Sequence, residues 1–240
     1  RQLLVLGSFL STTTTYVGER DAVVGNLLST GRLADWCSRL CRWGTGAHRE
    51  SIAQTFFNMA LNTMNNYGCK GLTLLEGNWF AELAGIPASS AHNALTTDAR
   101  SAALVQDLWI TDPPYADAIN YHELSDFFLA WYSGLLQKHF GEWSSDGRPA
   151  LAVRGTGADF MKSMVSCYTR FTQKMPDAGF QVVMFTHQDA AVWADLALIL
   201  WASGLQVTSA WCVATETDNN IAEGNYVQGT VLLVLRKQTG

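Results

Sequence analysis

The chain has 240 residues, of which 48% are hydrophobic and 15% are charged. This length suits one large domain or two small ones, and the composition excludes disordered, collagen-like and coiled-coil chains. The formal net charge of −5 argues against a chain that binds nucleic acid over its whole surface. Contact with a nucleic acid would have to use one face, or a basic domain elsewhere.

The chain carries no run of about 18 apolar residues, and its N-terminus lacks the pattern of a signal peptide. We therefore expect a soluble, cytoplasmic protein with no membrane partner. The odd number of cysteines and the absence of a C-x-x-C pair indicate buried thiols in a reducing compartment, with no disulfide framework, zinc ribbon or other metal site. The cysteines are Cys37, Cys41, Cys69, Cys167 and Cys212.

Before about residue 100 the spacing of apolar residues is helical. It predicts helical segments over residues 3–10 and 23–41, a third helix from His48 to Tyr67, and a short strand over Leu72 to Leu75. We expect a helical region at 1–70, followed by a catalytic region at 71–240.

After about residue 100 the pattern alternates between strands and helices. The order predicts an α/β fold with a mostly parallel sheet, helices on both faces and an antiparallel last strand. The predicted elements are a strand at Leu108–Ile110, a helix from Ser125, a helix at Ala158–Met175, a strand at Phe180–Phe185, a helix between Asp189 and Gly204, and strands at Leu205–Val213 and Tyr226–Leu235.

The tetrapeptide Asp112-Pro113-Pro114-Tyr115 stands where the first of these strands ends. Ligands of open α/β sheets bind at the carboxyl ends of strands. The Asp112 carboxylate and the Pro113 carbonyl could accept hydrogen bonds from an amino group, because consecutive prolines hold the backbone extended. Tyr115 offers a flat face on which a base could stack. The alternative is an ordinary strand-to-turn junction, since Asp and Pro are common turn residues.

The same tetrapeptide is the D-P-P-Y signature of amino-group methyltransferases, and the resemblance covers nearly the whole chain. The chain resembles a family of large prokaryotic adenine-specific DNA methylases whose full-length members also carry a zinc-ribbon segment. The stretches that carry the resemblance are TDPPYADAINYHELSDFFLAWY, RQLLVLGSFL, RLADWCSRLCRW, TFFNMALNTMNNYG and VVMFTHQDAAVWADLALILWASGLQVTSAW, with the pair Thr215-Glu216.

The resemblance implies a Rossmann-like sheet, S-adenosyl-L-methionine as cofactor and DNA as partner, with an adenine flipped into the D-P-P-Y pocket. It assigns Asp112, Pro113, Pro114 and Tyr115 to catalysis. Asp98, 14 residues before Asp112, would contact the cofactor together with Ala99, although a helix N-cap or a surface acid explains Asp98 as well. The residues assigned to substrate are Asn120, Tyr121, His187, Thr215 and Glu216. Structural roles remain alternatives for four of them. Asn120 could form a loop hydrogen bond, Tyr121 could pack in the core, and Thr215 and Glu216 could belong to a solvated hairpin.

Two departures from the family pattern shape the functional hypothesis. The glycine-rich cofactor loop that should follow a first strand is missing, and Gly155 and Gly157 imitate it only between two predicted helices. The zinc ribbon is missing as well. The chain is therefore interpreted as the C-terminal portion of a methylase whose cofactor loop lies upstream or in a partner subunit. The alternatives are a methyltransferase for RNA adenine or glutamine amides, and a catalytically silent binding subunit.

Overall fold

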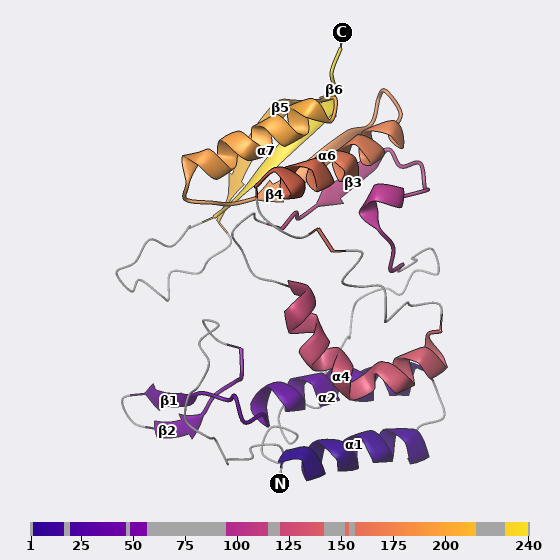
Figure 1. Ribbon diagram of the computed structural model, residues 1–240, viewed down its shortest axis with the longest axis vertical. Coiled ribbons are helices and arrows are strands. Elements are labelled where there is room, and N and C mark those ends of the chain that lie inside the picture. The colour runs from indigo at the N-terminus through magenta and orange to yellow at the C-terminus, as the bar shows by residue number, and fades with distance from the viewer. Residues whose placement is uncertain are drawn as a thin grey trace. The chain divides into compact units, whose positions relative to one another are not determined.

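The structure is a computed structural model, and its contacts divide the chain into two units (Figure 1). Unit 1 comprises Arg1–Leu95 and Tyr121–Asp146, and unit 2 comprises Thr96–Asn120 and Gly147–Gly240. The expected boundary between residues 70 and 71 lies outside the described residues. The structure describes residues 2–16, 20–46, 49–56, 95–114, 121–141, 152–153, 157–214 and 229–239.

The described part of unit 1 contains three helices and a two-stranded hairpin. Its small core consists of buried residues of the first two helices and the turn after them, with half-buried aromatic residues of the third helix packed against it: Leu6, Leu33, Ala34 and Cys37, then Phe127 and Trp131. The elements are α1 (Gln2–Tyr16), α2 (Arg20–Trp36), β1 (Trp43–Gly46), β2 (Arg49–Ile52) and α4 (Tyr121–His139).

The prediction of a helix beginning at His48 is wrong. Strand β2 pairs antiparallel with β1, with Trp43 opposite Ile52, and the Ala53 amide continues the ladder by donating to the Arg42 carbonyl over 2.9 Å. The spacing of apolar residues within one segment cannot reveal a partner strand, so the predicted helix begins too far toward the N-terminus. The rest of that predicted helix, and the predicted strand at residues 72–75, lie outside the described residues.

Two further helix boundaries differ from expectation. Helix α2 ends at Trp36, so Cys37 and Cys41 lie in the turns after it, and both thiols are buried as expected. Helix α4 begins at Tyr121 rather than at Ser125, which is an exposed residue of its first turns and not an N-cap. No helix in the described part of the chain is long and apolar enough to span a membrane.

Unit 2 is an α/β unit built on a four-stranded mixed sheet. Strand β4 pairs in parallel with β3, whereas β6 pairs antiparallel with both β4 and β5. Three strands therefore run in one direction and β6 runs in the opposite one, so the expected antiparallel last strand is confirmed, although only one neighbouring pair is parallel. In the order β3-β4-β6-β5 the strands are β3 (Leu108–Thr111), β4 (Phe180–Phe185), β6 (Thr230–Lys237) and β5 (Leu205–Val213).

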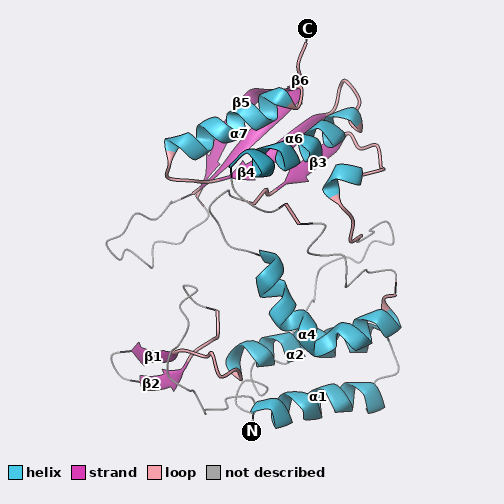
Figure 2. Ribbon diagram, viewed as in Figure 1, coloured by secondary structure: helices cyan, strands magenta, loops and turns pink. Residues whose placement is uncertain are grey.

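Two long helices, α6 (Gly157–Gln173) and α7 (Ala190–Ala202), cover one face of this sheet (Figure 2). Asp189 caps α7 as expected: its carboxylate accepts a hydrogen bond from the Ala191 amide over 2.8 Å. Gly204 follows the helix with a φ of +78°, a conformation that glycine adopts without strain. The core beneath the helices includes Met164, Tyr168, Phe171, Val183, Phe185, Leu196, Leu200 and Leu235.

The opposite face of the sheet carries exposed apolar side chains. Alternation along the strands places Leu108 and Ile110 of β3, with Trp211 of β5, away from the helices, and Ile110 is 61% and Trp211 65% exposed. The expectation of helices on both faces is therefore wrong for the described part of unit 2, because both crossover helices pack on the same side. Cys212 is exposed, contrary to expectation, since only Leu205 of β5 is buried.

Candidate active site

The sequence Asp112-Pro113-Pro114, hereafter the corner, follows directly after β3. The parallel register sets Thr111 beside Val183 of β4, so the corner lies at the sheet edge where β4 also ends. Ligands of open α/β sheets bind at this edge. The structure thus places the corner where the sequence predicted it.

The three residues of the corner differ in exposure. Asp112 is exposed, Pro113 is buried and Pro114 is half-buried. Within the described part of the chain, no hydrogen bond or ion pair is made by the Asp112 carboxylate. The carboxylate is therefore open to a ligand, while the adjacent proline anchors the backbone.

The residue before the corner is held by a helix distant in sequence. The Thr111 hydroxyl and the Tyr168 hydroxyl of α6 lie 3.1 Å apart, within hydrogen-bonding distance. Trp109, on the same face of β3, stacks on Phe171 of α6 with ring centroids 4.7 Å apart. The sequence predicted a helix over this segment but no role for Tyr168, and the one signal for such a role is that a buried tyrosine hydroxyl requires a hydrogen-bond partner.

A hollow beneath the corner is too small for a nucleobase. Its volume is about 30 Å³, room for ordered water only. A base that contacts Asp112 would therefore not occupy this hollow. The hollow is lined by residues of the corner, the two long helices and the end of β4, among them Pro114, Gly157, Phe160, Phe185, Asp195 and Leu196.

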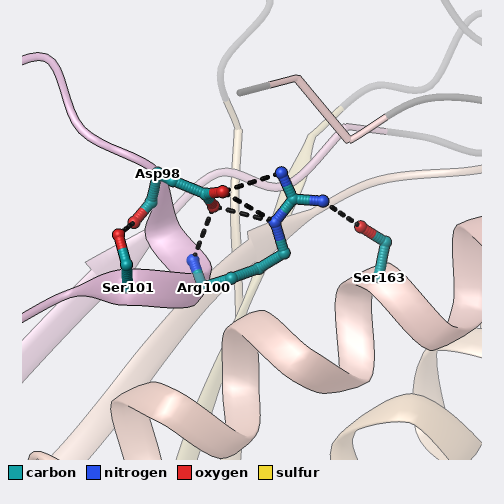
Figure 3. A network of polar contacts seen from close by, with 4 residues as sticks. All are labelled: Asp98, Arg100, Ser101 and Ser163. Carbon is teal, nitrogen blue, oxygen red and sulfur yellow. Dashed lines mark hydrogen bonds and ion pairs between the residues drawn. The ribbon is translucent and has the colours of Figure 1, made fainter. Parts of the chain in front are cut away.

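Asp98 is a helix N-cap and part of an ion pair (Figure 3). Its carboxylate accepts a hydrogen bond from the Arg100 amide over 2.9 Å and lies 2.8 Å from the Arg100 Nε and Nη2 atoms. These hydrogen bonds lower the pKa of Asp98 and raise the pKa of Arg100. Arg100 Nη1 also donates to the Ser163 hydroxyl of α6 over 3.2 Å.

Asp98, the residue expected to contact the cofactor, thus already has partners for its carboxylate. The N-cap alternative describes what the structure shows for Asp98, which holds the single-turn helix η1 (Ala99–Ser101) against α6. Ala99, the second predicted cofactor residue, is half-buried against the core of unit 2. Contact between Asp98 and a cofactor would require the carboxylate to share or release Arg100.

His187 lies at the same sheet edge as the corner, as expected. Its Nδ1 accepts a hydrogen bond from the Asp189 amide over 2.9 Å, and its carbonyl accepts one from Trp193 Nε1, also over 2.9 Å. An Nδ1 acceptor carries no proton, so the neutral ring has its proton on Nε2. These two hydrogen bonds, one to the ring and one to the carbonyl, hold His187 in the loop that leads into α7.

The remaining predicted residues are not tested by the geometry. Tyr115, Asn120, Thr215 and Glu216 lie outside the described residues, and of Tyr121 only its place at the start of α4 is described. At this edge the Thr186 hydroxyl, just after β4, donates to the Gly229 carbonyl, just before β6, over 2.9 Å. Among the described residues, no group of three or more His, Cys, Asp and Glu side chains is placed to hold a metal ion.

A larger cavity lies in unit 1, between α1, α2 and α4. Its volume is about 650 Å³, and none of the predicted site residues lines it. The Gln2 side chain at its wall donates to the Ser38 carbonyl over 3.1 Å. Its other walls include Leu3, Leu6, Ala34, Cys37, Arg39, Phe127 and Trp131.

Comparisons of the chain with protein-family models, curated proteins and solved structures find no match. The fold and the site by themselves define an α/β unit with an exposed carboxylate at the end of a strand.

Proposed function

We propose that the chain is the target-binding part of an S-adenosylmethionine-dependent DNA methyltransferase that acts on the exocyclic N6 amine of adenine. The observation that carries the proposal is the exposed Asp112 carboxylate beside buried Pro113 at the carboxyl end of a parallel strand. The antiparallel last strand agrees with the partial methyltransferase sheet that the resemblance implies.

The chemistry of the target explains the arrangement of the corner. The lone pair of an adenine amine is delocalised into the ring, so the amine is a poor nucleophile. Two acceptors aimed at its two N–H bonds favour the pyramidal amine and the positive charge that develops on nitrogen. Asp112 supplies one acceptor and the Pro113 carbonyl supplies the other. Tyr115 provides the stacking face for the flipped base.

The described residues do not fit the cofactor. S-adenosylmethionine would supply the methyl group, but Asp98 is paired with Arg100, and Gly157 begins a helix with a φ of +66° instead of following a strand. In the described part of the chain, no glycine-rich loop follows a strand. We therefore place the cofactor site in residues outside that part or in another polypeptide.

The test measures transfer of labelled methyl groups from S-adenosylmethionine to DNA, with any upstream coding region restored. Asp112→Ala should reduce transfer by about 10²-fold or more, as expected when one preorganised electrostatic partner is lost. Asp107→Ala is the matched control: Asp107 is also exposed and precedes the same strand, at the opposite sheet edge. Full transfer by Asp112→Ala would refute the mechanism.

The paired state of Asp98 also favours a second candidate, a catalytically silent binding subunit. Titration calorimetry with S-adenosylmethionine separates the two, because a silent subunit contributes to no cofactor site even when any upstream region and any partner polypeptide are present. RNA adenine and glutamine amides have the same kind of amino group. Competition among DNA, RNA and protein in one labelled assay identifies the substrate.

A further inference from the structure

The hydroxyl of Tyr168 is a buried polar group that the proposed chemistry does not use. Tyr168 is only 2% exposed, and its hydroxyl lies 3.1 Å from the hydroxyl of Thr111. Buried tyrosine hydroxyls normally have a hydrogen-bond partner. Here the partner is the residue directly before Asp112, which links α6 to the corner.

Helix α6 holds the Tyr168 ring in a fixed place. The ring packs edge to face against Phe171, with centroids 6.0 Å apart at 88°, and Phe171 in turn stacks on Trp109 of β3. Arg170 of the same helix donates from Nε to the Ala102 carbonyl over 2.7 Å. Because α6 is tied to β3 and to the segment before it, the Tyr168 hydroxyl is a fixed anchor for Thr111.

The geometry of the strand carries this anchoring to Asp112. Thr111, the last residue of β3, lies on the face of the strand that packs against α6, and Asp112 and Pro113 follow it directly. Thr111 is bonded to Tyr168, and Pro113 is buried. Exposed Asp112 thus stands between two anchored residues, which restricts the movement of its backbone.

We infer that Tyr168 is a positioning residue, which through Thr111 directs the Asp112 carboxylate toward the target amine. The inference rests on the proposed function, since it assigns Tyr168 a part in orienting the acceptor of that reaction. Burial, together with the nearby Cys167 and Asp112, raises the pKa of Tyr168 well above its ordinary value. The phenol therefore stays protonated over the working pH range, and the link to Thr111 persists.

The main test replaces Tyr168 by phenylalanine, which removes the hydroxyl and keeps the ring. We expect kcat for methyl transfer to fall about tenfold while KM for DNA stays within about twofold, because misplacement of a reacting group affects the chemical step. Thr111→Val should give the same result, and the double variant should be no slower than either single variant, since both changes remove one bond. The protein is assayed with any upstream coding region restored.

A second measurement does not depend on activity. Amide hydrogen exchange, followed by mass spectrometry, should become faster in the peptide covering residues 108–112 of Tyr168→Phe and stay unchanged over residues 180–185. Ser203→Ala is the matched control, because it also removes a buried hydroxyl of unit 2, one that donates to the Ile199 carbonyl over 2.7 Å. This control should change neither kcat nor exchange over residues 108–112.

The outcomes separate the inference from the proposed function. An unchanged kcat in a folded Tyr168→Phe protein, or a change in KM alone, overturns the positioning role. If the unsubstituted protein transfers no methyl group, the proposed function fails, and unchanged exchange over residues 108–112 then overturns the inference independently. If Tyr168→Phe does not fold, Thr111→Val decides by the same criteria.

Discussion

Asp112 and Asp98 are two carboxylates that the sequence placed in one site and the structure treats differently. Asp112 is exposed with an open carboxylate, whereas Asp98 is bonded to Arg100. The corner could be recognised from sequence because its residues are contiguous and the chemistry of each residue suggests a role in binding an amino group. The network of Asp98 could not, because Ser163, which holds Arg100 from α6, is remote along the chain.

At the residue scale we expect Asp98→Asn to lower the free energy of unfolding at pH 7 by about 1 kcal/mol, through loss of a partly exposed ion pair and weakening of an N-cap. Denaturant unfolding followed by circular dichroism measures this. Asp159→Asn is the control: the Asp159 side chain is 91% exposed and, among the described residues, forms a 3.7 Å surface pair with Lys162, so a change of similar size there would contradict the expectation.

The pH dependence of unfolding gives the sign of the Asp98 contribution. Its hydrogen bonds to Arg100 lower the pKa of Asp98 in the folded state. The stabilisation is therefore complete above the unfolded pKa of about 3.9 and is lost as pH falls through the lower folded pKa. The difference in unfolding free energy between the unsubstituted protein and Asp98→Asn should shrink below about pH 4. A constant difference down to pH 2 would contradict this.

The predicted helices and strands agree with the structure where residues within the element itself mark its bounds. Strands at Phe180–Phe185 and Leu205–Val213 have the expected bounds, and α7 lies between its expected cap and its expected terminal glycine. Strand β2 was missed because its stability comes from pairing with β1, which a single segment does not display. Local propensity therefore succeeded where a cap, glycine or apolar run marks the element, and failed where a partner strand decides.

Alanine substitutions at two glycines should change the stability of the protein in opposite directions. A Cβ at Gly179, just before β4, would lie 2.9 Å from the Asp107 carbonyl and 3.1 Å from the Pro176 carbonyl, whereas a Cβ at Gly134 in α4 would meet nothing within 4 Å. We expect Gly179→Ala to destabilise unit 2 by about 1–3 kcal/mol through overpacking, and Gly134→Ala to stabilise α4 by about 0.5–1 kcal/mol. Thermal melting followed by circular dichroism measures both, and equal effects would contradict this account.

The described part of unit 2, taken as a whole, is asymmetric across its sheet. Both long helices pack on one face, and the other face exposes Leu108, Ile110, Trp211 and Val213, which are 42%, 61%, 65% and 43% exposed. The sequence did not disclose this, because apolar runs such as that of β3 suggested strands buried on both faces. Which face each crossover helix covers is a property of the tertiary fold.

A matched pair of threonine substitutions tests this asymmetry. Ile110→Thr, on the exposed face, should change the free energy of unfolding by less than about 1 kcal/mol and reduce binding of a hydrophobic fluorescent dye. Val183→Thr, on the covered face, should cost about 1–3 kcal/mol, because Val183 is fully buried and a hydroxyl there would lack a partner. A similar loss of stability in both variants would show that the first face is covered in solution.

The sequence alone determined the α/β character of unit 2, most of its strand and helix positions, and the place of the corner at a strand end, since these depend on residues close together in the chain. The tertiary structure decided three things: the contact of Arg100 with Ser163, the support of Thr111 by Tyr168, and, among the described residues, the burial of one sheet face and not the other. Each depends on how α6 packs against the sheet. That packing joins residues tens of positions apart, a distance that local spacing and propensity do not encode.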